Sequence, residues 1–179
     1  HGGSTTEVEA VPAAGYHFIS WSDGNTNARR SDSNVTADAT YTATFAENDN
    51  VTISYVSADT TMGTVSPASE TLAPATGVAA GSTATAAVGY HFVNWTDSQD
   101  SEVSTSASFT PGKVNGLNVA ATYTANFAED DNVTITYVSA DTTMGTVSPA
   151  SETLAPATGV AAGSTASPAV GYHFVNWTD

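Results

Sequence analysis

The ten residues VGYHFVNWTD occur at 88–97 and again, letter for letter, at 170–179, and a diverged copy, AGYHFISWSD, lies at 14–23. Working outward from these copies, residues 50–97 recur at 132–179, an offset of 82 residues. Only three positions differ: Ser54/Thr136, Thr85/Ser167 and Ala86/Pro168. Self-similarity at a fixed period is the signature of a tandem array of small modules. The sequence therefore predicts repeats of about 82 residues.

The predicted repeats divide the chain into three parts. Residues 1–49 are the C-terminal part of a first repeat, since ATYTATFAENDNVT at 39–52 matches ATYTANFAEDDNVT at 121–134. Residues 50–131 form a complete second repeat, and residues 132–179 form the N-terminal part of a third. The second repeat is eight residues longer than the first near FTPGKVNGL at 109–117. We expect either a window on a longer array or partial repeats that another molecule completes.

Alternation of apolar and polar residues indicates strands in every repeat. The pattern is clear in VTISYV at 51–56, YHFVNW at 90–95 and TYTANF at 122–127, and Gly- and Pro-containing turns separate these segments. No segment has a 3.6-residue apolar stripe of helix length. We therefore predict an all-β fold of tandem small β-sheet modules, β-grasp-like or small sandwiches, with little or no helix. The predicted core consists of Val51, Ile53, Tyr55, Val65, Tyr90, Phe92, Trp95, Tyr123 and Phe127.

The recurring phrase Gly-x(12)-Gly-Tyr-x-Phe-x-x-Trp, followed by a Tyr-Thr-Ala-x-Phe strand, resembles the divergent internalin-type B repeat, also called the Listeria–Bacteroides repeat. The matching residues are Gly77, Gly89, Tyr90, Phe92, Trp95, Tyr123, Ala125 and Phe127, and in the first copy Gly3, Gly15, Tyr16, Phe18, Trp21, Tyr41, Ala43 and Phe45. The resemblance implies modules of microbial surface proteins that act as stalks, adhesin segments or weak binding modules. It also implies a β-grasp fold with a helix, for which this sequence has no convincing segment.

The charge of the chain restricts its partners. Eighteen Asp and Glu residues face three Lys and Arg residues, which gives a net charge of −15. Such a surface repels phosphate backbones and anionic lipids, so we predict no nucleic-acid partner. No apolar run reaches the length of a membrane span, so we predict no membrane insertion. The composition favours an extracellular or cell-surface location. With no cysteine, the chain has neither disulfides nor thiolate metal sites.

Acidic residues cluster between the last strand of one repeat and the first strand of the next. Carboxylates with an Asn and backbone carbonyls are the hard oxygen ligands that Ca²⁺ requires. Calcium is therefore the one cofactor that the sequence suggests, and the alternative is a solvated acidic turn. The candidate ligands are Glu47, Asp49 and Asn50 at the first junction and Glu129, Asp130, Asp131 and Asn132 at the second.

No constellation of catalytic residues stands out. His17, His91 and His173 occupy the same slot between Tyr and Phe, and we expect them on the exposed face of a strand. No Ser or Asp forms a recognisable nucleophile–His–acid set, and no glycine-rich phosphate loop follows a strand. We predict that the protein is not an enzyme. Asn-x-Thr sequons provide candidate glycosylation sites at Asn34, Asn50, Asn94, Asn132 and Asn176.

Two functions fit these observations. The first is a structural segment of an extracellular surface protein: a stalk, an adhesin shaft, or a filament subunit whose neighbouring copies complete each other's partial repeats by strand addition. The alternative is an adhesion module that binds a glycan or a host protein through exposed aromatic side chains. Burial of the recurring aromatic residues distinguishes the two.

Overall fold

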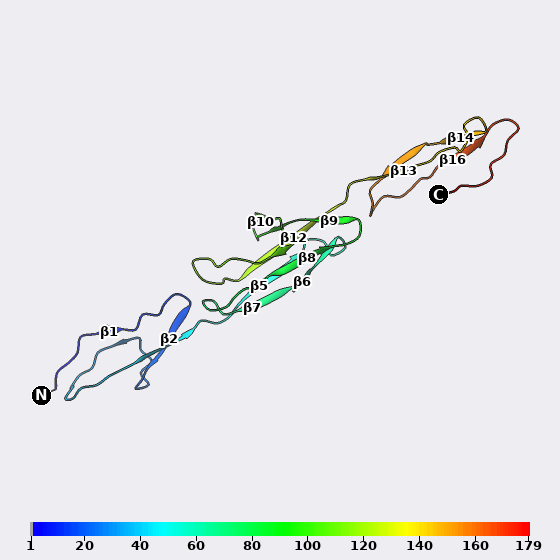
Figure 1. Ribbon diagram of the computed structural model, residues 1–179. Coiled ribbons are helices and arrows are strands. Elements are labelled where there is room, and N and C mark those ends of the chain that lie inside the picture. Colours follow the sequence, from blue (N-terminus) through cyan, green and yellow to red (C-terminus); the bar gives the residue numbers. More distant parts are fainter. Residues whose placement is uncertain (1) are drawn as a thin grey trace.

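The computed structural model describes residues 2–179, and within them it contains strands but no helix, which confirms the all-β prediction. Figure 1 shows three groups of strands that follow one another along a line, with the two termini in the outer groups. We call these groups the first segment (residues up to 49), the central repeat (50–131) and the third segment (132–179).

The central repeat consists of two sheets. The larger sheet has the strand order β10-β9-β12-β5-β7, and the smaller sheet has the order β11-β8-β6. The strands are β5 (Val51–Ser57), β6 (Gly63–Ser66), β7 (Ser69–Leu72), β8 (Ser82–Ala86), β9 (Tyr90–Thr96), β10 (Glu102–Ser104), β11 (Ser108–Phe109) and β12 (Ala121–Glu129).

Strand β12 is the centre of the larger sheet. On one edge it pairs with β5 in parallel, with Tyr123 opposite Tyr55, and on the other it pairs with β9 in antiparallel fashion, with Ala125 opposite Trp95. Parallel neighbours require a long crossover connection, and strands β6 to β11 form it. The first and last strands of one repeat therefore lie side by side.

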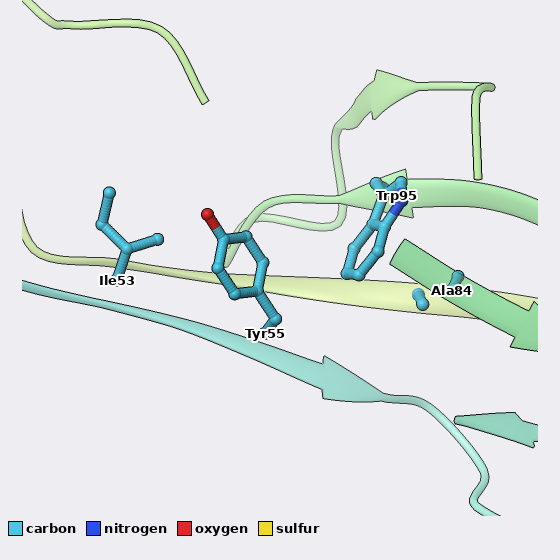
Figure 2. Close-up of a cluster of buried hydrophobic side chains, with 5 residues drawn as sticks. Ile53, Tyr55, Ala84 and Trp95 are labelled. Atoms are coloured by element: carbon cyan, nitrogen blue, oxygen red, sulfur yellow. The ribbon is translucent and has the colours of Figure 1, made fainter. Parts of the chain in front are cut away.

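The core lies where the two sheets face each other. Trp95 and Tyr55 are completely buried, with ring centroids 5.9 Å apart in an edge-to-face arrangement. Figure 2 shows Ile53 and Tyr55 on one side of β5, directed toward the same core as Trp95 and Ala84. Of the predicted core, Ile53, Tyr55 and Trp95 are buried and Val65, Phe92, Tyr123 and Phe127 pack against them. The prediction was wrong for Val51 and Tyr90, which are half-buried and do not belong to this cluster. The prediction omitted Ala84, Ala125, Leu72 and Phe109.

Glu70, in β7, links β5 to the loop before β8 by hydrogen bonds. It accepts a 2.5 Å hydrogen bond from the Tyr55 hydroxyl and two from the backbone N–H groups of Ala80 and Gly81. Burial raises the pKa of Glu70, but these hydrogen bonds outweigh it and hold the pKa below its ordinary value. Glu70 therefore remains an acceptor for all three donors at neutral pH.

The first segment repeats the second half of this fold. Its strands are β1 (Val8–Glu9), β2 (Tyr16–Trp21), β3 (Arg29–Arg30) and β4 (Ala43–Glu47), paired as β1-β3 and β2-β4. Arg30 takes the place that Phe109 has in the central repeat, since Arg30 lies opposite Val8 as Phe109 lies opposite Ser82. Its guanidinium stacks 3.5 Å from the Tyr41 ring centroid. Asp23 and Asp32 neutralise this buried charge at 3.1 and 2.6 Å.

The third segment repeats the first half of the fold. Its strands are β13 (Val133–Thr136), β14 (Gly145–Ser148), β15 (Ser151–Leu154) and β16 (Thr165–Pro168), paired as β13-β15 and β14-β16. Residues 172–178 form no strand, although the identical residues 90–96 form β9. In the central repeat β9 pairs with β12, and the third segment contains no counterpart of β12. Strand formation here depends on the partner rather than on local propensity.

Candidate functional site

The junction between repeats is a direct contact made by one glutamate. Three residues, 48–50, separate β4 from β5. Just before them, Glu47 reaches the turn at 73–77 of the central repeat. Its Oε1 accepts hydrogen bonds from the backbone N–H groups of Ala75 (2.6 Å) and Thr76 (2.8 Å), and its Oε2 accepts one from the Thr76 hydroxyl (2.7 Å). Successive N–H groups in a turn form a natural cradle for an anion.

The second junction is built in the same way. Residues 130–132 separate β12 from β13, and Glu129 at the end of β12 reaches the turn at 155–159. Its Oε1 accepts hydrogen bonds from the N–H groups of Ala157 and Thr158, both at 2.8 Å, and its Oε2 accepts one from the Thr158 hydroxyl at 2.9 Å. The contact is therefore a repeated feature of the array.

Two glycines allow the repeats to approach this closely. Gly15 and Gly89 have φ values of +83° and +84°, in the left-handed region that favours glycine. A Cβ atom on Gly15 would lie 3.0 Å from the Cβ of Ala75, and one on Gly89 would lie 2.9 Å from the Cβ of Ala157. A side chain at either glycine would push the next repeat away.

The linkers are held at their first residue. The N–H of Asn48 donates to the carbonyl of Gly15 at 2.8 Å, and the N–H of Asp130 donates to that of Gly89 at 2.9 Å. The histidine of each copy adds a side-chain contact: His17 Nδ1 lies 3.1 Å from Asn48 Oδ1, and His91 Nδ1 lies 2.9 Å from Asp130 Oδ1. The linker therefore continues the contact and leaves little free chain between repeats.

The longer loop of the central repeat strengthens the first junction. Leu117 lies against Gly15, since a Cβ atom there would be 2.8 Å from Leu117 Cδ2. Lys113 Nζ donates to the Ala75 carbonyl. Asn118 is buried, and its Nδ2 donates to the carbonyls of Ala73 (2.9 Å) and Gly77 (3.0 Å). These bonds fix the conformation of the turn to which Glu47 binds.

Hydrogen bonding keeps both glutamates ionised. The backbone N–H and hydroxyl of Thr76 hold the pKa of Glu47 below its ordinary value, and Lys113 acts in the same direction. The N–H of Thr158 likewise lowers the pKa of Glu129. Hydrogen bonds to the charged form of a carboxylate favour that form. Each junction is thus a charge-assisted contact at neutral pH.

The residues predicted as calcium ligands are divided between different roles. Glu47 and Glu129 bind the next repeat, and Asp130 contacts His91. The remaining four are exposed: Asp49, Asn50, Asp131 and Asn132. Among the described residues, no three or more His, Asp or Glu side chains are grouped so that they could hold a metal ion. Calcium binding at the junctions stays a prediction.

The other predicted sites lie on the surface or in the core. His17 and His91 are exposed and lie in β2 and β9, as predicted, whereas His173 is exposed but lies in no strand. Four sequon asparagines are exposed, namely Asn34, Asn50, Asn132 and Asn176, whereas Asn94 is half-buried and donates to Glu102. Glycosylation stays a prediction. In the central repeat Trp95 is buried and Phe92 packs on the core, so these two side chains offer no exposed aromatic platform.

Sequence reasoning missed the role of the turns at 73–77 and 155–159. The available signal was recurrence: FAE and APATG occur in both copies, so each glutamate precedes its turn by the same number of residues. Recurrence alone does not say that the two elements touch, because three strands lie between them in the chain.

Comparison with known protein families identifies these modules. A model of the divergent InlB B-repeat domain matches residues 1–49, 53–131 and 132–179. The chain belongs to the divergent InlB B-repeat family. No curated protein and no solved structure shows significant similarity to the chain.

Membership of the divergent InlB B-repeat family makes the chain a tandem array of the repeat modules typical of bacterial surface proteins. It is not a known family of enzymes. Across residues 2–179, no helix is long and apolar enough to cross a membrane.

Proposed function

We propose that this array of divergent InlB B-repeats is a semi-rigid shaft on the outside of a bacterial cell, holding a more distant part of a surface protein away from its base. The observation that carries the proposal is the repeated junction, in which Glu47 and Glu129 each bind two backbone N–H groups and a hydroxyl of the next repeat. A flexible tether would have no need of such contacts. In a filament, copies of the chain would continue the same shaft.

Removing the glutamate is expected to loosen the junction. In Glu47→Ala, the N–H groups of Ala75 and Thr76 lose their acceptor, so the first segment should swing relative to the central repeat. The chain has no cysteine, so nitroxide spin labels can be attached at introduced cysteines. We suggest the exposed pair Ser33→Cys and Ser98→Cys. The distance distribution between the two labels should be narrow in the parent chain and several-fold broader in Glu47→Ala.

Asp49→Ala is the matched control for this experiment. Asp49 lies in the same linker and is exposed, and it has no hydrogen-bond partner among the described residues. The control should keep the narrow distribution. The same comparison can be made at the second junction, with Glu129→Ala as the test variant and Asp131→Ala as its control. The spin labels are then attached to cysteines introduced at Ser98 and Val160. A broad distribution of label-to-label distances in the parent chain would contradict the proposal that the array is a semi-rigid shaft.

Acidification is expected to loosen the same junctions. The pKa of Glu47 in the folded chain lies below its ordinary value of 4.5. Its contribution to the junction is therefore complete above that value and is lost as the pH falls through the lower, folded-state pKa. Spin-label distances should broaden below about pH 4.5 in the parent chain. Glu47→Gln should remove this pH dependence at the first junction. Other carboxylates, including Glu70, also have lowered pKa values, so the inter-repeat distance is a better readout than overall melting.

The alternative, an adhesion module that reads a glycan through aromatic side chains, has weaker support. Its most prominent candidate, Trp95, has no exposed surface in the complete repeat. Trp177, the counterpart of Trp95 in the third segment, is 47% exposed, but that segment has no strand corresponding to β12 to cover it.

A further inference from the structure

The loop between β11 and β12 contains Asn115, the only asparagine in the chain that is followed by a glycine. Asn115 and Gly116 have φ values of +50° and +81°. Two backbone hydrogen bonds, of 2.8 and 3.0 Å, join Val114 and Leu117 across them. Positive φ at both central residues is the mark of a type I′ turn, for which Asn-Gly is a preferred sequence. The side-chain amide of Asn115 therefore precedes a main-chain nitrogen whose own residue has no side chain.

Both groups of this pair are open to solvent. Asn115 and Gly116 are exposed, and neither the Asn115 side chain nor the Gly116 N–H has a hydrogen-bond partner among residues 2–179. A Cβ atom at Gly116 would meet nothing within 4 Å. The turn is an isolated bridge outside the named strands, so it can open locally while the sheets stay intact. Solvent can therefore remove the Gly116 amide proton, and the nitrogen can approach the Asn115 side chain.

The other asparagines do not combine these features. Each is followed by a residue with a side chain, which shields the main-chain nitrogen. Asn118, three residues later, is also buried, and two carbonyls hold its amide. Asn126 precedes Phe127, and its amide donates to two side chains of β9. The reactive pair in this chain is therefore Asn115 with Gly116.

We propose that Asn115 is a site of spontaneous deamidation, and that the isoaspartate formed there weakens the first junction. The deprotonated Gly116 nitrogen attacks Cγ of Asn115, an intramolecular step favoured by proximity. A new C–N bond forms, the bond from Cγ to the side-chain nitrogen breaks, and this nitrogen takes a proton from solvent and leaves as ammonia. Water then opens the cyclic imide: cleavage at Cγ gives aspartate, and cleavage at the main-chain carbonyl gives isoaspartate. The reaction consumes water, releases ammonia and needs no oxidant.

The loop around this turn lies on the first junction. Leu117 lies against Gly15 of the preceding repeat, since a Cβ atom there would be 2.8 Å from Leu117 Cδ2. Lys113 Nζ donates to the carbonyl of Ala75, and the N–H of Ala75 is one of the donors to Glu47. The conformation of this loop therefore supports the contact between the repeats.

Isoaspartate changes the path of the main chain in this loop. Its link to Gly116 runs through the former side-chain methylene, so the main chain gains a carbon atom within the turn. The ends of the loop cannot shift to accommodate this atom, because Pro111 and Asn118 are buried. The added length therefore displaces the residues between them, including Lys113 and Leu117. This weakening rests on the proposed shaft, because only a junction that is held can be loosened.

Ageing of the full chain at mildly alkaline pH tests the chemistry. Because Lys113 is the only lysine, trypsin releases a peptide that begins at Val114, and tandem mass spectrometry of this peptide locates each conversion. Asn115 should convert at least several-fold faster than any other asparagine. An isoaspartate methyltransferase should label the aged peptide. Conversion of Asn115 no faster than that of Asn118 would overturn the proposal.

The spin labels at Ser33→Cys and Ser98→Cys test the effect on the junction. In the aged parent chain, the distance distribution should gain a broad component whose share follows the fraction of isoaspartate. Asn115→Gly is the matched control, because glycine adopts the positive φ of this turn but has no amide to lose. It should keep the narrow distribution throughout. Freshly prepared Asn115→Asp adds the charge without the extra main-chain atom, and it should also keep the narrow distribution.

This inference and the proposed shaft fail in different measurements. Aged chains that contain isoaspartate at residue 115 but keep a narrow distribution would overturn the weakening, as would a broad component that develops equally in Asn115→Gly. An Asn115 that does not convert, in a chain with narrow distances, removes this site and leaves the shaft standing. A broad distribution in the fresh parent chain contradicts the shaft and, with it, the weakening.

Discussion

Replacing Trp95 with alanine is expected to destabilise the central repeat strongly, because the loss of a completely buried tryptophan costs about 3–5 kcal/mol in the free energy of unfolding. The Trp95 ring contacts Tyr55, Phe92 and Phe109 at centroid distances of 5.9, 6.2 and 5.9 Å. Its Nε1 also donates to the carbonyl of Ala107 at 3.1 Å. Small domains have only about 5–15 kcal/mol of stability, so the substitution removes a large fraction. Urea denaturation followed by circular dichroism measures it.

The chain contains its own control for this experiment. Trp177 lies in the same ten-residue sequence but is 47% exposed, so Trp177→Ala should cost less than about 1 kcal/mol. Equal losses from the two substitutions would show that the third segment has a core as complete as that of the central repeat.

A second large effect is expected at Gly81. This buried glycine has a φ of +82°, and a Cβ atom there would lie 2.1 Å from the carbonyl oxygen of Phe109 in β11. Gly81→Ala therefore combines a left-handed backbone, which costs about 1–2 kcal/mol, with a collision against main chain that cannot rotate away, which adds about 1–3 kcal/mol. Strand β11 should detach from β8 and Phe109 should leave the core.

Gly163 is the matched control for this prediction. It has a φ of +81°, but a Cβ atom there would meet nothing within 4 Å. Gly163→Ala should therefore cost only the backbone term, about 1–2 kcal/mol. Urea denaturation of both variants separates the two terms. If Gly81→Ala were no worse than Gly163→Ala, the predicted collision with β11 would be wrong.

The repeat and the strand alternation were enough to predict an all-β array and most of its core. Ile53, Tyr55 and Trp95 follow from their alternating positions and their size. Phe109 could not be predicted, because it lies in a two-residue strand within a Ser- and Thr-rich region that shows no alternation. Its role depends on pairing with Ser82 in β8, 27 residues earlier. In the first segment an arginine fills the same position, which no pattern of hydrophobic residues indicates.

Small residues and pairing partners explain the rest of what the sequence did not reveal. Ala84 and Ala125 are buried because sheets approach closely at these points, and an alanine alone carries no such signal. The two copies of VGYHFVNWTD have the same local propensity, yet only the copy opposite β12 forms a strand. The acidic linkers indicate that the junctions are special, but carboxylates in a sequence suggest a metal site. The observed acceptors are directed instead at backbone N–H groups, which have no signature in the sequence.

The glutamate contact has an evolutionary consequence. Each junction relies chiefly on the main-chain donors of a turn. A repeat that contains this turn can therefore follow any repeat that ends in the glutamate. Duplication or deletion of whole units by unequal recombination then leaves every remaining interface intact. The length of such a protein can therefore change by whole repeats without the evolution of a new interface.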